Sequence, residues 1–301
     1  MKHVISIDIG GTKTLGALFN ENAEILKSIR IPTQPKLGPD NLIESLFKII
    51  DELSQLEKID CISIGSAGRV NTDDGTIFYS SDNIPNWTGV KLKEIVENKY
   101  NILTVVENDC KVTGLGEEWK GAAQGTKSYV CIALGTGIGA AVKYDEVLLH
   151  GAHWSAAELG HMLLYPKGRQ CNCGLKGCFE QYCSGPSLVK RYNDLTEVKI
   201  RNGYEFFDLV KNKDSNALLV LNEFTEDLSM AIISILNIYD PEVVILGGGL
   251  IDTKEYWWNQ MMEIIKRSSI SRLFVPRIEP ALLGSSAAIY GAAYLGFNTI
   301  K

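Results

Sequence analysis

The sequence predicts an α/β protein made of two similar lobes, with a ligand bound in the cleft between them. Predicted strands alternate with predicted helices along most of the chain. A unit of strand, glycine-threonine turn and strand at residues 4–19 recurs at residues 129–144, which indicates an internal duplication. The length of 301 residues also matches two domains of about 150 residues each.

The first half begins with two strands at 4–8 and 14–19, which are joined by a glycine-rich turn. Apolar residues at helical spacing predict a helix at 41–53, and a short apolar run predicts a strand at 61–65. The remaining predicted elements are a strand near 25–31, a helix at 90–100, a buried strand at 102–106 and a helix at 110–120. This alternation favours a largely parallel central sheet.

The second half starts the pattern again, with strands at 129–133 and 140–144 around a second glycine-threonine turn. A long amphipathic helix is predicted at 223–239, where Pro241 ends it. A buried strand at 243–246 runs into three glycines, and a helix of small residues at 284–295 closes the chain. Each half therefore places a glycine turn after its first strand, which is the basis for expecting two lobes.

Composition and charge exclude several classes of protein. Hydrophobic residues make up 45% and charged residues 22% of the chain, a balance unlike that of a disordered protein. The net charge of −6 argues against a nucleic-acid partner, because phosphate contacts need basic surface. The most apolar stretches, 243–251 and 287–297, are too short to span a bilayer and are broken by glycine. No signal peptide precedes the first strand, so we expect a cytoplasmic protein that binds neither membranes nor nucleic acid.

Three glycine turns are candidate nucleotide-binding segments. The first runs from Asp8 to Lys13 between two strands, so it is neither a Walker loop nor a dinucleotide fingerprint, which both need a helix start. Its glycines leave backbone amides open to an oxyanion, and Asp8 is placed to hold a magnesium ion. A plain hairpin turn is the alternative. The residues singled out in these turns are Asp8, Gly10, Gly11, Thr12 and Lys13; Gly135, Thr136 and Gly137; and Gly247, Gly248 and Gly249, where a base or ribose fits without a blocking side chain.

A cluster of cysteines predicts a structural zinc site. His161, Cys171, Cys173 and Cys178 are a complete tetrahedral set, with no position left open for catalysis. The alternatives are free thiols in a loop, or a set in which Cys183 replaces one of these ligands. The other three of the seven cysteines, Cys61, Cys110 and Cys131, lie in or beside apolar segments and are expected to be packed core thiols, and we expect no disulfides.

Carboxylates near the predicted strand ends are candidate catalytic and binding groups. Asp109 follows a buried strand, where it could accept a proton from a hydroxyl that attacks a phosphoryl group. The alternative is that Asp109 caps the following helix. Asn108 stands beside it, and Glu158, His161 and Glu180 lie near the zinc cluster. Carboxylates, an amide and an imidazole are the groups that bind a ring of hydroxyls.

These segments resemble the ROK family of sugar kinases and sugar-responsive regulators. The resemblance is carried, in family order, by Asp8 to Lys13, Glu107-Asn108-Asp109, Leu134 to Gly139, Glu158-Leu159-Gly160-His161 and Cys171 to Glu180. It implies an actin-like, hexokinase-type fold with a small N-terminal lobe, residues 1–115 plus 288–301, and a larger C-terminal lobe, residues 116–287, that carries the zinc loop. It also implies a homodimer.

The resemblance also implies roles for single residues. Asp109 would be the general base, and Asn108, Glu158, His161 and Glu180 would hold the sugar, with His161 using its second ring nitrogen on zinc. Asp8 to Lys13 and Gly135 to Gly137 would surround the ATP phosphates, and Gly247 to Gly249 would lie near the adenosine. Regulators of the family carry a DNA-binding extension before the first glycine turn, and the seven residues before Asp8 argue against one here.

We therefore expect an ATP- and magnesium-dependent kinase that phosphorylates a hexose or an N-acylhexosamine at the 6-hydroxyl. The segment with Gly68 and Arg69 resembles that of N-acetylmannosamine kinases more than that of glucokinases, so the sequence favours N-acetylmannosamine. Arg69 would contact the substituent at the 2-position, and the block beginning at Asn83 resembles one found in glucose and aminosugar kinases alike. The alternatives are a glucokinase, a sugar sensor without catalysis, and a non-enzymatic scaffold of actin-like fold.

Overall fold

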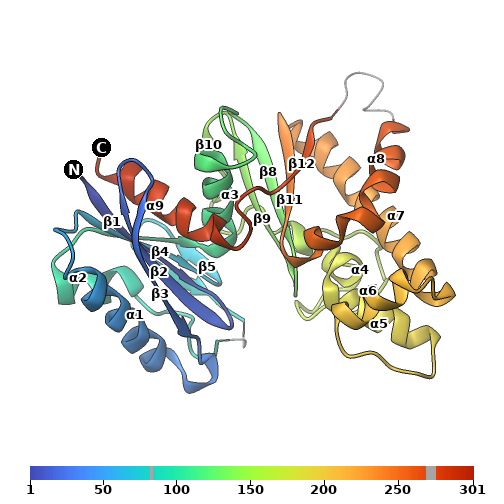
Figure 1. The fold of residues 1–301 in the computed structure, drawn as a ribbon, viewed down its shortest axis with the longest axis horizontal. Helices are drawn as coiled ribbons and strands as arrows, with labels where there is room; N and C mark the ends of the chain where they lie inside the picture. The colour runs from blue at the N-terminus through green and yellow to red at the C-terminus, as the bar shows by residue number, and fades with distance from the viewer. Residues whose placement is uncertain (82–83, 269–275) are drawn as a thin grey trace. The chain divides into compact units, whose positions relative to one another are not determined.

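The computed structural model describes residues 1–81, 84–268 and 276–301, which form two compact units (Figure 1). Unit 1 comprises Met1–Gly125, Leu148–Ala156 and Leu282–Lys301. Unit 2 comprises Thr126–Val147 and Ala157–Ala281. The chain therefore passes from one unit to the other four times, and both termini belong to unit 1.

Unit 1 is built on a five-stranded mixed sheet with the order β3-β2-β1-β4-β7. The strands are β1 (His3–Ile9), β2 (Lys13–Asn20), β3 (Ile25–Pro32), β4 (Cys61–Ser66) and β7 (Thr104–Asn108). β1, β4 and β7 are parallel, whereas β2 is antiparallel to both of its neighbours. The largely parallel sheet expected from the sequence is thus found only on one side, because the short links flanking β2 can form only hairpins.

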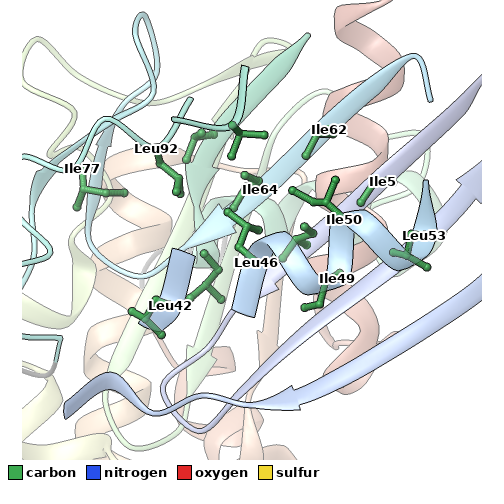
Figure 2. Close-up of a cluster of buried hydrophobic side chains, with 14 of the residues drawn as sticks. Ile5, Leu42, Leu46, Ile49, Ile50, Leu53, Ile62, Ile64, Ile77 and Leu92 are labelled. Carbon is green, nitrogen blue, oxygen red and sulfur yellow. The ribbon is translucent and has the colours of Figure 1, made fainter. Parts of the chain in front are cut away.

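One face of this sheet is covered by α1 (Pro39–Leu53) and α2 (Leu92–Tyr100), which share one buried core (Figure 1). Figure 2 shows α1 and its side chains in this core. The apolar side of α1, including Leu46 and Ile50, packs against Ile5, Ile62 and Ile64 of β1 and β4 in a buried core. The α1 positions recur every three or four residues, as one buried face of a helix requires. A small hairpin, β5 (Arg69–Asn71) and β6 (Thr76–Tyr79), and the short 3-10 turn Pro35–Leu37 complete this part of the unit.

The opposite face is covered by α3 (Asp109–Lys120) and α9 (Ala287–Thr299), with Val4 and Phe19 pointing towards α9. The two helices approach closely through glycines. A Cβ at Gly116 would lie 2.0 Å from the carbonyl oxygen of Ala287, and one at Gly291 would lie 1.6 Å from that of Val112. The helix that begins at Asp109 is therefore fixed to the C-terminal helix by contacts that only glycine permits.

The division of the chain differs from the predicted boundaries at 115 and 288. All of α3 stays in unit 1, because its Glu117 carboxylate accepts backbone N–H bonds from Leu282, Leu283 and Ala122. These bonds bring the connection before α9 into unit 1 as well. The segment Leu148–Ala156 is a further part of unit 1 that the sequence did not indicate.

Unit 2 repeats the strand pattern of unit 1 in a second sheet, with the order β10-β9-β8-β11-β12. The strands are β8 (Tyr129–Leu134), β9 (Ile138–Tyr144), β10 (Val147–Leu148), β11 (Val243–Gly247) and β12 (Ile278–Pro280). β8 and β9 form an antiparallel pair, as β1 and β2 do, and β8, β11 and β12 are parallel, as β1, β4 and β7 are. The internal duplication predicted from the two glycine-threonine turns is therefore present in the strand pairing.

Helices make up much of the rest of unit 2. They are α4 (Glu180–Cys183), α5 (Gly185–Leu195), α6 (Gly203–Lys211), α7 (Ser215–Tyr239) and α8 (Trp258–Lys266), with 3-10 turns at Leu159–His161 and Gly249–Tyr256, and a further 3-10 turn, Gly284–Ser286, precedes α9 in unit 1. α7 begins at Ser215 rather than at 223, because the Asp214 side chain accepts the Ala217 N–H and starts the helix earlier. Among the helices of the described part of the chain, none has the length and apolar character that a bilayer span requires.

The α3–α9 contact predicts a large stability loss for the substitution Gly291→Ala. The added methyl group would meet the Val112 carbonyl, so the helices must separate, and we expect the free energy of unfolding to fall by about 2 kcal/mol or more. Chemical denaturation would measure the change. Gly203→Ala, at a helical position with open space around the new Cβ, is the control and should change stability by less than about 0.5 kcal/mol. Equal stability of the two variants would contradict the proposed close contact.

Candidate active site

Asp109 is the first residue of α3, and Asn108 before it fixes the geometry of this strand-to-helix junction. The Asn108 Oδ1 accepts the N–H bonds of Cys110 and Lys111, at 3.0 and 3.1 Å, and so caps the helix. Its Nδ2 donates to the Asp109 Oδ1 and to the Gly68 carbonyl, both at 2.9 Å. Asn108 is therefore the N-cap residue and orients the Asp109 carboxylate, whose Oδ1 also accepts the Cys110 N–H at 2.8 Å.

The first glycine turn lies in the same unit as Asp109. Gly10 donates its N–H to the Lys13 carbonyl at 3.1 Å, and Gly11 and Thr12 are exposed at the tip. At the start of the turn, the pKa of Asp8 is raised to about 7, mainly by burial and secondly by the negative charge of Asp109, while Lys13 acts in the opposite direction. Asp8 and Asp109 therefore repel each other, and a divalent cation bound there would relieve the repulsion.

The second glycine turn, in unit 2, is held by Glu180. The Glu180 Oε2 accepts the Ile138 N–H at 2.8 Å, and a Cβ at Gly137 would lie 2.5 Å from the same oxygen. Gly135 donates to the Gly137 carbonyl and accepts from the Gly185 N–H, each at 2.9 Å. Glu180 was expected to hold a sugar, and within unit 2 it lies directly against the turn expected to hold phosphates.

A cavity of about 980 Å³ in unit 2 is large enough for a nucleotide. Of the glycine-turn residues, Gly135, Thr136 and Gly249 line it, whereas Gly247 is buried at the end of β11. Gly248 has a φ of 81°, and a Cβ there would lie 2.3 Å from the Leu134 carbonyl, so it lets the chain pass the end of β8. Most of the wall carries no motif in the sequence; it includes Lys190, Asn193, Asn202, Tyr204 and Asp208. Tyr204 is 87% exposed at the start of α6.

The predicted metal ligands come together in unit 2. The ligand atoms of His161, Cys171, Cys173 and Cys178 all lie within 4.8 Å of one another. The His161 Nδ1 is 3.8 Å from the Cys171 Sγ, and the Cys173 and Cys178 sulfurs are 3.6 Å apart. A tetrahedron with bonds of about 2.3 Å has edges of about 3.7 Å, so these residues fit a zinc ion.

The other cysteines lie outside this cluster. Cys183 is buried and its thiol donates to the Phe224 carbonyl, so the exchange with a zinc ligand is not observed. Cys61 and Cys131 are buried as expected, and Cys110 is half-buried. None of these seven described cysteines forms a disulfide.

Glu158 precedes the 3-10 turn Leu159–His161 and His161 is its last residue, so these two residues, three apart, lie on the same side. The turn is pressed against β9, since a Cβ at Gly160 would lie 2.2 Å from the Ile138 carbonyl. Because zinc coordination would use the Nδ1 atom of His161, its Nε2 would remain for another contact. Both residues belong to unit 2, whereas Asn108 and Asp109 belong to unit 1.

The candidate selectivity segment lies in unit 1 beside Asn108. Gly68 has a φ of 98°, and its carbonyl accepts the Asn108 amide. The Arg69 guanidinium lies over the Tyr79 ring, 5.4 Å from its centre, within the small β5–β6 hairpin. Asn83 lies outside the described residues. Trp87, from the same block, is buried and donates its Nε1–H to the Ser66 Oγ at 3.0 Å.

The raised pKa of Asp8 predicts a pH-dependent stability for the protein without metal or nucleotide. The folded state keeps the Asp8 proton up to about pH 7, while the unfolded state releases it near the ordinary pKa of 3.8. Stability therefore falls as the pH rises from about 4 to 7, and the loss is complete above pH 7. Asp8→Asn should remove this fall and be more stable than the wild type at pH 8, by at most about 4 kcal/mol.

Denaturation at a series of pH values would measure the effect. Asp145→Asn, at an exposed residue after β9, is the control and should keep the wild-type profile. A wild-type profile in Asp8→Asn would contradict the raised pKa.

Comparison with known proteins gives the family of the chain. The model of the ROK family matches residues 4–298. The chain is 30% identical to the glucokinase of Thermotoga maritima over 96% of both chains. It is also 30% identical to the N-acetyl-D-glucosamine kinase of Photobacterium profundum, over 97% of this chain and 98% of that one.

The ROK hexokinase of Thermus thermophilus has the same fold, with a TM-score of 0.89 and 27% identity over 99% of both chains. This likeness confirms the predicted α/β architecture of the hexokinase type. Since the family model covers almost the whole length and the fold is shared from end to end, the chain belongs to the ROK family.

Proposed function

We propose that the protein is an ATP- and magnesium-dependent kinase that phosphorylates a hexose or an N-acylhexosamine at its 6-hydroxyl. The observation that carries the proposal is the junction of β7 and α3, where Asn108 orients the Asp109 carboxylate in the same unit as the first glycine turn. The nucleotide-sized cavity next to the second glycine turn supports ATP as the phosphoryl donor.

In this proposal Asp109 accepts the proton of the sugar hydroxyl as that oxygen attacks the γ-phosphoryl group. Asn108, the last residue of β7, holds this carboxylate in position by donating its Nδ2–H to the Asp109 Oδ1. Lys13 supplies positive charge to the phosphates, and the exposed amides of Gly11 and Thr12 supply hydrogen bonds. Bound magnesium would be held near Asp8 and would neutralise charge on the transferred group.

The sugar contacts follow the expectations of the sequence. We assign Asn108, Glu158, His161 and Glu180 to the sugar hydroxyls, with the His161 Nε2 as the atom that faces the sugar. Gly68, Arg69 and Asn83 are assigned to the substituent at the 2-position. The zinc ion is a structural brace that fixes His161 relative to Glu180, two residues past Cys178, and takes no part in the chemistry.

N-acetylmannosamine is the acceptor that the Gly68-Arg69 segment favours. The likeness to the Thermotoga glucokinase favours glucose as a second candidate, and the likeness to an N-acetyl-D-glucosamine kinase favours the aminosugar class. A sensor that binds sugar without catalysis would not need both glycine turns and the oriented Asp109. The homodimer implied by the resemblance remains a prediction, for which sedimentation equilibrium is the measurement.

Asp109→Asn should keep sugar binding and lose activity. An amide cannot accept the hydroxyl proton, so kcat should fall by about 10²- to 10⁴-fold while the dissociation constant for the sugar changes little. Coupled-assay kinetics and calorimetry with sugar alone would measure the two quantities. The exposed Asp145→Asn serves as the matched control with wild-type kinetics. A near-wild-type kcat in Asp109→Asn would remove Asp109 from the role of base.

Cys173→Ser should remove the zinc and weaken the sugar site. We expect the purified wild type to carry about one zinc per chain, and the variant to carry little and melt at a lower temperature. The KM for the sugar should rise, because His161 and Glu180 lose their common support. Elemental analysis, melting curves and kinetics would follow these changes, and Cys61→Ala, outside the cluster, should keep its zinc. An unchanged melting temperature and sugar affinity in zinc-free protein would contradict the proposed brace.

The acceptor is identified by ADP release with one sugar at a time: N-acetylmannosamine, N-acetylglucosamine, glucose, mannose and fructose. We expect turnover with N-acetylated sugars to exceed that with glucose. Arg69→Ala should then lower kcat/KM for the N-acetylated sugar about 10- to 100-fold, and that for glucose much less. A preference for glucose would make the protein a glucokinase. Sugar binding without any turnover would instead favour the sensor.

A further inference from the structure

A buried carboxylate next to the candidate base has no role in the proposed function. Glu107, in β7, is 2% exposed, and both of its oxygens have partners in unit 1. The Oε1 accepts the backbone N–H of Asn108 at 2.7 Å. The Oε2 lies 2.6 Å from the Nε2 of His150. Because an ionised carboxylate can only accept hydrogen bonds, the imidazole donates in this pair.

His150 belongs to the segment Leu148–Ala156, which is part of unit 1 although the residues on both sides of it belong to unit 2. The segment is closed on itself by the Ala156 N–H, which donates to the His150 carbonyl at 3.0 Å. Its Trp154 has a left-handed φ of 52° and packs on Phe78 of β6, with ring centres 5.2 Å apart. The segment therefore contacts the rest of unit 1 at two places: Trp154 packs on β6, and His150 contacts Glu107 of β7.

The contacts form a continuous chain that ends at the candidate base. His150 donates to Glu107, Glu107 accepts the Asn108 N–H, and the Asn108 side chain donates to Asp109. Burial makes the Glu107 carboxylate dependent on these partners, since a buried charge without one is strongly unfavourable. Without the imidazole, the Glu107 carboxylate must turn towards another partner. That movement alters the support of Asn108, and through it the direction of the Asp109 carboxylate.

We propose that His150 and Glu107 are positioning residues for Asp109 in phosphoryl transfer. The inference rests on the proposed function, because it assigns them to the reaction of that same site. Neither side chain is assigned a contact with sugar or ATP, so they act on the rate of transfer and leave nucleotide and sugar affinity nearly unchanged.

The test is a double-mutant cycle on kcat, made with the full-length protein and the sugar that the acceptor panel identifies. His150→Leu and Glu107→Ala should each lower kcat by about 10- to 100-fold, the loss expected from a misplaced catalytic group. The KM for ATP and the dissociation constant for the sugar should stay within about twofold. Because the two residues act through one another, the double variant should be no slower than the slower single variant.

Conservative variants separate positioning from folding. His150→Gln places an amide N–H at a similar reach and should recover most of the kcat lost in His150→Leu, as Glu107→Gln should relative to Glu107→Ala. If melting curves show that His150→Leu or Glu107→Ala does not fold, the test is made with His150→Gln and Glu107→Gln instead. His153→Leu is the matched control, because His153 lies exposed on the same segment and its Nδ1 contacts the neighbouring Ala152 carbonyl, and it should keep the wild-type kcat.

The outcomes distinguish this inference from the function on which it rests. A wild-type protein that turns over none of the sugars overturns the proposed function and the positioning roles together. A kcat within about twofold of wild type in His150→Leu, fully multiplicative losses in the cycle, or an equal loss in His153→Leu overturns the positioning roles alone.

Discussion

The side chain of Asn108 is the interaction on which the rest of the site depends. It makes four hydrogen bonds at once: two cap α3, one holds the Asp109 carboxylate and one holds the Gly68 carbonyl. An amide is required, because the side chain must both accept from the helix and donate to the carboxylate. Helix start, candidate base and selectivity segment are thereby fixed by a single residue at the end of a parallel strand, the edge where α/β proteins bind their ligands.

Glycine at points of close approach allows the elements around this residue to pack. In unit 1, Gly116 and Gly291 allow α3 and α9 to approach closely. In unit 2, Gly137 allows Glu180 to lie against the second glycine turn, and Gly248 allows the chain to pass the Leu134 backbone just before that turn. In both units an antiparallel strand pair carries the turn and parallel strands follow it. The duplicated turns reverse the chain tightly, and in the proposed function their backbone amides bind phosphate oxygens. Glu180, two residues past Cys178, connects the second turn to the predicted zinc loop by accepting the Ile138 N–H.

Much of the fold could be predicted from the sequence, because periodicity and glycine turns are local signals. The strand pair around Asp8 to Lys13, the α1 apolar face and the cluster of His161 with three cysteines follow from short-range patterns of this kind. What could not be predicted depends on contacts between distant residues. The start of α7 follows from an Asp214 cap ahead of the apolar pattern, and the unit boundary follows from Glu117 bonding to residues far along the chain. The cavity wall around Tyr204 and the pairing of His150 with Glu107 carry no motif, so only the structure brings them together.

In the proposed function this chain transfers a phosphoryl group from ATP to the 6-hydroxyl of a sugar. Correlated ³¹P and ¹H NMR of the reaction mixture is the first measurement to make, because it shows which atom carries the phosphate. With N-acetylmannosamine, ATP and magnesium, we expect a new phosphomonoester signal coupled to the two protons on carbon 6, formed as ADP appears. Inorganic phosphate as the only product, a phosphate coupled to a different sugar proton, or ATP left intact with each sugar tried would contradict it.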